Sequence, residues 1–339
     1  MNKRIISIIG PKGMPSSFRG TSGIEAYVEH QIKQLTKTNH IVHCYVRKWT
    51  KPTKTMSYKN VLVIPVLSIN SKHLDAITYS LIASVRASLN DSTLVWYHGI
   101  GPAFFSWIPK LFRKTVYTTI HSLDWQRDKW GGVSKIFLRL SEFIALHFST
   151  KIFVVSNSLK KYYKSRTNKP IIVSKYPLIK HKPIKADLIT KKYGLKNNSY
   201  ILYLGRFVPE KRIEWLINAF IKIKPNNLKL VLAGGSSHSD GYVNMIKCLV
   251  NKNTKQSKNI ILTKYVFGQE KEELLSNSLL MVLPSKIEGY PVSVVEALGY
   301  EKTCLVGHYL KNEYSSSLVK YYKQDDFNSF LKKIKYLTS

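Results

Sequence analysis

The sequence predicts an α/β protein with two doubly wound, mostly parallel sheets in tandem. Its 339 residues exceed what one core usually organises and match two domains of about 150 residues each. Short apolar, β-branched runs alternate with longer stretches of helical period, as in βαβ units. The alternation breaks at one proline-containing segment and then resumes, which predicts a second sheet.

The apolar runs define the expected strands. In the first half we expect strands at 5–9, 41–46, 61–66, 94–97, 116–120, 152–155 and 171–173. In the second half we expect them at 200–204, 229–233, 260–263, 279–283 and 303–306, and a last helix at 325–337. The segment 176–183 has two prolines and no period, so it is expected to link a first domain of 1–180 to a second of 181–339.

Charge alone does not choose the class of partner, and a solvated lysine-rich surface is the alternative for about half of the excess. With 53 Lys and Arg against 20 Asp and Glu, the formal net charge is +33, which attracts nucleic acid, anionic lipid or phosphorylated substrates. No RNP-like motif, zinc finger or basic zipper organises these side chains, so no specific nucleic-acid partner is expected. An anionic membrane surface fits better, because basic clusters beside apolar patches bind anionic bilayers.

From the sequence we expect no export, no membrane insertion and no bound metal. The stretch before Pro11 is too short for a signal peptide, and no apolar run reaches the roughly 18 residues of a transmembrane helix. Cys44, Cys248 and Cys304 share no metal-ligand spacing and are expected to be reduced thiols. These features predict a cytoplasmic protein.

Ligands of open α/β sheets bind at the carboxyl ends of the strands, so the loops there are expected to carry the chemistry. After the first strand, glycines precede a helix whose N-terminus offers N–H groups to a diphosphate; they include Gly10, Gly13, Gly20 and Gly23. This is not a G-x-G-x-x-G motif, and a purely structural loop is an equal alternative on these residues.

Two loops of the second half carry charged side chains. Gly205, Arg206 and Lys211 follow the strand at 200–204, and a guanidinium with an ammonium suits a leaving diphosphate. The alternative is a solvated basic turn. After the strand at 279–283, Glu288 lies in a glycine turn and Glu296 lies in the helix that follows. We expect Pro291 at the first helical position, with the helix N–H groups directed at phosphate.

These residues resemble the motifs of retaining GT-B glycosyltransferases. Glu288 to Glu296 resembles the E-x7-E motif, and 205–211 resembles the G-R…E-K phosphate loop. The first half is similar to bacterial rhamnosyltransferase-like enzymes of capsule and O-antigen synthesis, through residues 8–15, 23–25, 99–102 and 121–132. The resemblance implies a GT-B fold of two Rossmann-like domains with an interdomain cleft, the acceptor side first and the donor-binding domain second.

The same resemblance implies a role for each site residue. Arg206 and Lys211 would bind the donor diphosphate, Glu296 the ribose and Glu288 the transferred sugar. The donor site would also include Gly205, Gly289, Tyr290, Pro291 and Val292, and the loop of Gly20 and Gly23 would close on the phosphates. His121 and Asp124 would lie near the reacting centre. The alternatives are a hydrogen-bonded core histidine for His121 and a helix N-cap for Asp124.

The chain also departs from the family pattern. Ser22 stands where many relatives have a glycine before Gly23, which would stiffen the phosphate loop. Arg212 stands where many have glycine, so that turn is expected to differ. The region beyond Val306 is short and lacks the usual glycine-rich return. These departures make domain closure and turnover less firmly predicted than donor binding.

The predicted activity is transfer of a hexosyl or deoxyhexosyl group, with retention, from a nucleoside-diphosphate sugar to a glycan acceptor. No cofactor is expected beyond this co-substrate. No metal site is expected either, because no D-x-D pair lies at a strand end. The alternatives are a nucleotide-sugar epimerase of the same architecture, a basic nucleic-acid-binding protein, and an inactive glycan-binding relative.

The acceptor is expected to be lipid-linked, with the protein peripheral on the inner face of the plasma membrane. The segment 100–112 is rich in aromatic and aliphatic side chains and precedes Arg113 and Lys114. Such a segment can enter a bilayer interface. The alternative is a helix of the core.

Overall fold

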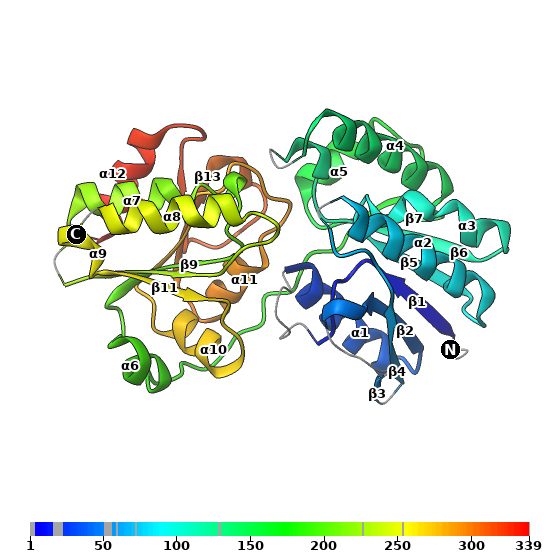
Figure 1. Ribbon diagram of the computed structural model, residues 1–339, viewed down its shortest axis with the longest axis horizontal. Coiled ribbons are helices and arrows are strands. Elements are labelled where there is room, and N and C mark those ends of the chain that lie inside the picture. Colours follow the sequence, from blue (N-terminus) through cyan, green and yellow to red (C-terminus); the bar gives the residue numbers. More distant parts are fainter. Residues whose placement is uncertain are drawn as a thin grey trace. The chain divides into compact units, whose positions relative to one another are not determined.

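The computed structural model describes residues 4–15, 23–50, 56–58, 60–71, 73–127, 130–225, 227–252 and 254–338. The chain divides into two compact units, Met1–Tyr176 and Pro177–Ser339. Each unit is a parallel sheet with helices on its faces, which confirms the predicted fold class (Figure 1).

The sheet of the N-terminal unit has the strand order β3-β4-β2-β1-β5-β6-β7-β8. All pairs are parallel except β3 with β4, which is antiparallel. The strands are β1 (Ile5–Ile9), β2 (Ile41–Arg47), β3 (Met56–Tyr58), β4 (Val61–Val66), β5 (Leu94–His98), β6 (Thr115–Ile120), β7 (Lys151–Val154) and β8 (Ile171–Val173).

Helices join these strands as crossovers. They are α1 (Gly23–Lys37), η1 (Lys48–Thr50), α2 (Leu74–Leu89), η2 (Pro102–Phe105), α3 (Trp107–Leu111), η3 (Asp124–Gln126), α4 (Gly132–Phe148) and α5 (Asn157–Lys164). The central strand β5 is buried along its whole length, as expected for a strand covered on both faces.

The C-terminal unit has a sheet of order β11-β10-β9-β12-β13-β14, in which every pair is parallel. Its strands are β9 (Tyr200–Leu204), β10 (Lys229–Ala233), β11 (Ile260–Lys264), β12 (Leu280–Leu283), β13 (Thr303–Gly307) and β14 (Val319–Tyr322). Its helices are α6 (Leu188–Tyr193), η4 (Pro209–Lys211), α7 (Ile213–Ile223), α8 (Asp240–Lys252), α9 (Thr254–Ser257), α10 (Gly268–Ser276), α11 (Val292–Gly299), η5 (His308–Leu310) and α12 (Phe327–Thr338).

The last helix completes the core of its own unit. Helix α12 packs against α7 and β14. Phe330 and Ile334 are buried in the same apolar cluster as the strands of the C-terminal sheet. The Trp215 ring lies 5.4 Å from that of Phe327. The region after Val306, short as it is, therefore supplies both an edge strand and a covering helix.

The three cysteines are free thiols: Cys44 and Cys304 are buried, and Cys248 is exposed on α8. In the described part of the chain, no helix is long and apolar enough to cross a membrane.

Candidate donor site and histidine pair

The loop after β9 is held against the loop after β10. The Gly205 N–H donates to the Ala233 carbonyl at 3.0 Å, and the Phe207 N–H donates to the Gly235 carbonyl at 2.8 Å. A Cβ on Gly234, whose φ is +156°, would lie 1.7 Å from the Gly205 carbonyl oxygen. Glycine is required there because the two backbones touch.

The basic loop continues through η4 to Arg212, whose backbone is left-handed with φ 49° and ψ 45°. The turn is therefore the one that glycine favours, although the residue is arginine. The guanidinium lies 4.6 Å from the centre of the Trp215 ring and forms an ion pair with Asp325. These contacts stabilise a backbone conformation that costs an L-residue about 1 kcal/mol.

The structure brings Lys211 and Glu288 together from loops far apart in the sequence. Their side chains form an ion pair, and both are largely buried. The backbone ties the same loops, because the Lys286 N–H donates to the Glu210 carbonyl at 2.8 Å. A cation and a carboxylate thus meet at the carboxyl edge of β9 and β12, where ligands of open α/β sheets bind. Arg206 also lies in this basic loop, and its carbonyl accepts a 2.8 Å hydrogen bond from the Tyr203 hydroxyl.

Helix α11 begins at Val292, one residue later than expected, and Pro291 is its N-cap. Glu296 accepts a 2.7 Å hydrogen bond from the Lys271 ammonium of α10. Lys271 was not anticipated, because its helix carries no motif and its contact with Glu296 arises only when α10 packs on α11.

Aromatic side chains support the turn that holds Gly289 and Tyr290. The Tyr290 ring stacks on that of Tyr314 with centroids 5.2 Å apart. The Tyr314 hydroxyl donates to the Pro291 carbonyl at 3.4 Å. Burial, with a smaller contribution from Glu313, raises the pKa of Tyr290 to about 12. Tyr314 follows β13, in a region where the sequence showed no motif.

In the N-terminal unit, two histidines face each other at the carboxyl ends of β5 and β6. The His98 Nδ1 and His121 Nε2 atoms lie 3.2 Å apart, and the Tyr27 ring meets His121 edge-on at 5.0 Å. Burial lowers the pKa of His98 well below its usual range and that of His121 to about 4. Both rings are therefore neutral near pH 7, and His121 acts there as a hydrogen-bonding group, not as a cation.

The sequence did not single out His98, although it directly follows the strand expected at 94–97, at the edge where ligands bind. Its Nε2 is buried and has no hydrogen-bond partner among the described residues. The expected alternative for His121, a hydrogen-bonded core histidine, is consistent with this pair.

Asp124 begins η3, whose N-cap is Leu123, so the alternative of a helix N-cap for Asp124 is wrong. Its carboxylate lies 3.0 Å from Arg127 Nε and accepts a 2.8 Å hydrogen bond from the Ser122 hydroxyl. Asp124 thus lies in the same loop as His121, three residues further along the chain.

Of the two glycines predicted to close on phosphate, Gly20 lies outside the described residues, and Gly23 is the first residue of α1. The loop after β1 is fixed by α1, because the Lys12 N–H donates to the Glu25 carboxylate at 2.8 Å. Within the described ranges, no group of three or more His, Cys, Asp or Glu is placed to hold a metal ion.

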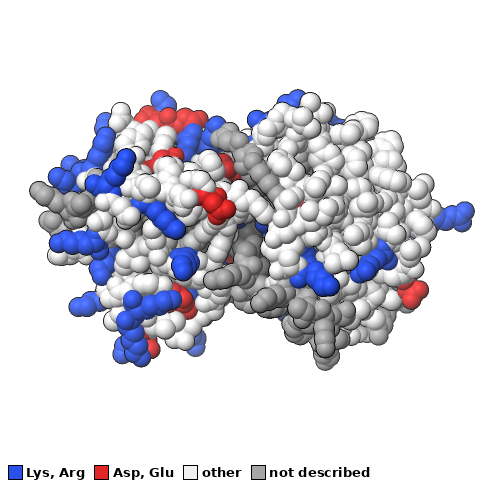
Figure 2. Space-filling model, in the orientation of Figure 1, with Lys and Arg blue, Asp and Glu red and all other residues white. Residues whose placement is uncertain are grey.

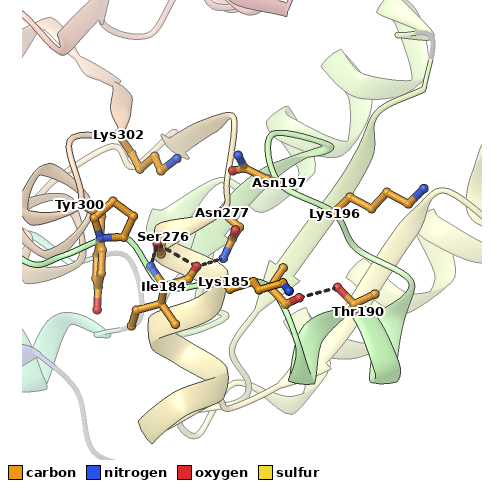
Figure 3. Close-up of a pocket in the computed structure, with 11 residues that line it drawn as sticks. Ile184, Lys185, Thr190, Lys196, Asn197, Ser276, Asn277, Tyr300 and Lys302 are labelled. Carbon is orange, nitrogen blue, oxygen red and sulfur yellow. Dashed lines mark hydrogen bonds between the residues drawn. The ribbon is translucent and has the colours of Figure 1, made fainter.

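A separate open pocket of about 540 Å³ lies at the other edge of the C-terminal sheet (Figure 3). Asn197, Asn277 and Lys302 line it from segments that precede β9, β12 and β13. The Asn277 amide donates to the Ile184 carbonyl at 2.9 Å. None of the predicted site residues lines this pocket.

Two family models match the chain, one for each unit. Residues 21–173 match the family Glycosyltransferase Family 4. Residues 186–326 match the family Glycosyl transferases group 1. Each match lies within one of the two structural units.

Curated relatives are similar over part of their length. A UDP-Gal:alpha-D-GlcNAc-diphosphoundecaprenol alpha-1,3-galactosyltransferase of Escherichia coli is 26% identical over 234 residues, covering 64% of this chain and 58% of the relative. An uncharacterized glycosyltransferase of Methanocaldococcus jannaschii is 26% identical over 168 residues, covering 46% and 42%. The chain thus matches less than two thirds of either relative.

Solved structures share the whole fold. Sucrose-phosphate synthase from Thermosynechococcus elongatus has a TM-score of 0.81 at 17% identity, covering 99% of this chain and 90% of that one. Anabaena HepE in complex with UDP and glucose has a TM-score of 0.75 at 13% identity, covering 98% of this chain and 89% of that one. WaaG, a glycosyltransferase involved in lipopolysaccharide biosynthesis, has 0.73 at 13%, covering 98% and 90%. The N-terminal unit is therefore similar to Glycosyltransferase Family 4 and the C-terminal unit to Glycosyl transferases group 1, and the chain shares the two-domain α/β fold of these solved structures.

Proposed function

We propose that this protein transfers a hexosyl or deoxyhexosyl group from a nucleoside-diphosphate sugar, with retention, to a glycan acceptor. The observation that carries the proposal is the Lys211–Glu288 contact at the ligand-binding edge of the domain that matches Glycosyl transferases group 1. Relatives of this domain pair include HepE, solved with UDP and glucose, and the E. coli galactosyltransferase with its UDP-Gal donor. UDP-sugars are therefore the first donors to test.

Charge complementarity supports the role of each donor-site residue. A bound diphosphate would replace Glu288 as the ion partner of Lys211. Arg206, in the same loop, would be a second cation that contacts the diphosphate. Glu288 would then accept hydrogen bonds from the sugar hydroxyls, and Glu296 from the ribose. The N–H groups that begin α11 at Val292 would complete the phosphate site.

The proposed chemistry needs no dedicated protein base. The bond from the anomeric carbon to the diphosphate breaks, and the acceptor hydroxyl attacks from the face that the phosphate leaves. A phosphate oxygen takes the hydroxyl proton. Arg206 and Lys211 stabilise the developing negative charge, and neutral His121 offers a hydrogen bond to sugar or acceptor.

For the acceptor we propose a lipid-linked saccharide of a bacterial surface polysaccharide, used at the cytoplasmic face of the plasma membrane. The name of the E. coli relative specifies a diphosphoundecaprenol-linked acceptor. The name of WaaG places that neighbour in lipopolysaccharide synthesis. Through the resemblance of residues 121–132, we also propose that the donor carries a rhamnosyl group and that the product is a capsule or O-antigen.

The test is transfer onto bacterial membranes from UDP-, GDP- and dTDP-sugars, with Arg206→Ala and Glu296→Ala. Each variant is expected to lose about 10²- to 10³-fold in turnover of one donor class. Arg166→Ala and Asp91→Ala are matched controls, because both side chains are exposed and belong to the N-terminal unit, outside the proposed donor site. Turnover that survives in both site variants contradicts the proposed donor site.

Metal independence is a further part of the proposal, since Arg206 and Lys211 supply the positive charge that a metal would otherwise provide. Turnover is expected to be unchanged by EDTA. A strict requirement for added Mg²⁺ would overturn this part alone.

The other candidate functions make different predictions. An epimerase would convert donor without acceptor, and the relatives named above give it no support. Salt-sensitive retention on DNA without donor binding would favour a nucleic-acid-binding protein. Donor binding without transfer would indicate an inactive relative.

A further inference from the structure

Helix α2 has its apolar side chains on the outside. Apart from Tyr79, its buried residues are small or polar, whereas four of its aliphatic residues are exposed, Leu89 by 69%. The buried set is Asp75, Tyr79, Ser80, Ala83, Ser84, Ala87 and Ser88, and the exposed set is Leu74, Leu81, Val85 and Leu89. A surface helix of a globular protein shows the opposite arrangement.

Helix α4 repeats this inversion. Val133, Ile136, Leu140 and Phe143 recur at intervals of three and four residues and form one exposed stripe, in which Val133 is 85% exposed. The core side of the helix includes Ser141 and Glu142. The Glu142 carboxylate accepts a hydrogen bond from the Tyr163 hydroxyl at 2.5 Å, so this buried polar group has a donor within the fold.

The two stripes belong to one surface, because α3 packs against both α2 and α4. At their N-terminal ends, Ser134 Oγ lies 3.2 Å from His73 Nδ1. Helix α3 and the residue after it add Trp107, Leu111 and Phe112, with Leu111 71% exposed. We call the face formed by α2, α3 and α4 the outer apolar face.

The segment 100–112 contributes only partly, contrary to the expectation of one membrane-entering stretch. Phe105 and Ile108 are buried in the core, and only its C-terminal part reaches the surface. The larger share of exposed apolar side chains comes from α2 and α4, which the sequence analysis did not associate with membranes.

The charge on the outer apolar face is mostly positive. The acidic side chains of these three helices, Asp75 and Glu142, are both buried. The exposed charged side chains at its margins are mostly basic and include Arg86, Arg113 and Arg139; Asp91, two residues beyond the end of α2, is an acidic exception. Figure 2 shows the region of α2, α3 and α4 nearly free of charged side chains, in a protein of net charge +33.

We propose that the outer apolar face docks on an anionic lipid bilayer. Exposed Leu, Val, Ile, Phe and Trp on helices that lie along a surface can enter the headgroup region, while basic side chains at the margin contact anionic lipid. A second copy of the chain would bring like charges together at this margin, which disfavours it as the occupant. The proposal does not rest on the transferase function, because vesicle binding is measured without donor or acceptor.

The test is co-sedimentation of the full chain with phosphatidylcholine vesicles, with and without phosphatidylglycerol. We expect binding to the anionic vesicles. Combined Val133→Ser, Ile136→Ser and Phe143→Ser substitutions are expected to weaken it about tenfold or more, because they remove exposed apolar area without touching the core. Met245→Ser with Tyr336→Ser is the matched control, since both side chains are exposed in the other unit.

Circular dichroism melting shows whether the variants are folded, and Arg206→Ala should bind vesicles like wild type. Equal vesicle binding by wild type and the α4 variant would overturn the proposal. So would the absence of vesicle binding together with a wild-type dimer that the α4 variant converts to monomer, which would assign the face to a second copy. Transfer activity with a lipid-free acceptor tests the proposed function separately.

Discussion

At the scale of single residues, the histidine pair has a consequence for stability. His98 and His121 are neutral when folded, because burial lowers the pKa of both; His121 lowers that of His98 further, and Arg127 that of His121. In the unfolded chain each would bind a proton near its ordinary value of 6.5. Protons therefore bind more readily to the unfolded state, and stability is lost as pH falls through the interval from 6.5 to about 4.

We expect His121→Gln to flatten this dependence. The His121 shift from 6.5 to about 4 corresponds to on the order of 3 kcal/mol between pH 7.5 and pH 4. Urea unfolding of wild type and variant across this range measures the difference. His308→Gln, at an exposed position, is the control. Parallel pH curves for wild type and His121→Gln would show that His121 protonates freely in the folded protein.

The Lys211–Glu288 pair separates stability from function. Lys211→Met leaves the largely buried Glu288 carboxylate without this cation and should lower the free energy of unfolding by about 2 kcal/mol. Lys211→Met combined with Glu288→Gln should recover most of that loss but not the turnover, because diphosphate still lacks its cation. Urea unfolding and donor turnover of both variants measure the two effects. Recovery of turnover in the double variant would show that Lys211 is not part of the donor site.

At the scale of elements, the crossing of the loops after β9 and β10 depends on Gly234. Gly234→Ala forces a methyl group onto the Gly205 carbonyl and is expected to cost about 3 kcal/mol and to abolish donor binding. Gly241→Ala is the matched control, because a Cβ there meets nothing within 4 Å and its helix favours alanine. Thermal unfolding and nucleotide titration compare the pair. A stable Gly234→Ala protein that binds donor would show that the loops can separate.

The sequence predicted most strands to within one or two residues, because parallel strands are continuous apolar runs. It missed β3 (Met56–Tyr58) and β14 (Val319–Tyr322), which are short edge strands without such runs. The donor-site loops were predicted because their residues are consecutive. His98, Lys271 and Tyr314 were not, since each joins its site through packing between distant elements.

At the scale of the whole molecule, the net charge of +33 predicts retention on any polyanion. Retention on heparin and on DNA of unrelated sequences should be similar and should fall steeply with salt, because it depends on counterion release. Arg206→Ala should not change it, since one charge is a small part of the total. Column retention at increasing salt measures this. A salt-resistant preference for one DNA sequence would contradict this prediction and would favour nucleic-acid binding as a function.

The distribution of thiols offers an experimental handle. Cys248 is exposed on α8, whereas burial encloses Cys44 and Cys304 and raises the pKa of both thiols. A maleimide fluorophore should therefore react with the native protein at one position and with the denatured protein at three. The wild-type chain can thus carry a single spectroscopic reporter on the C-terminal unit, without prior removal of cysteines. The fluorescence anisotropy of this reporter, measured with and without vesicles, would follow binding of the protein to the vesicles in real time.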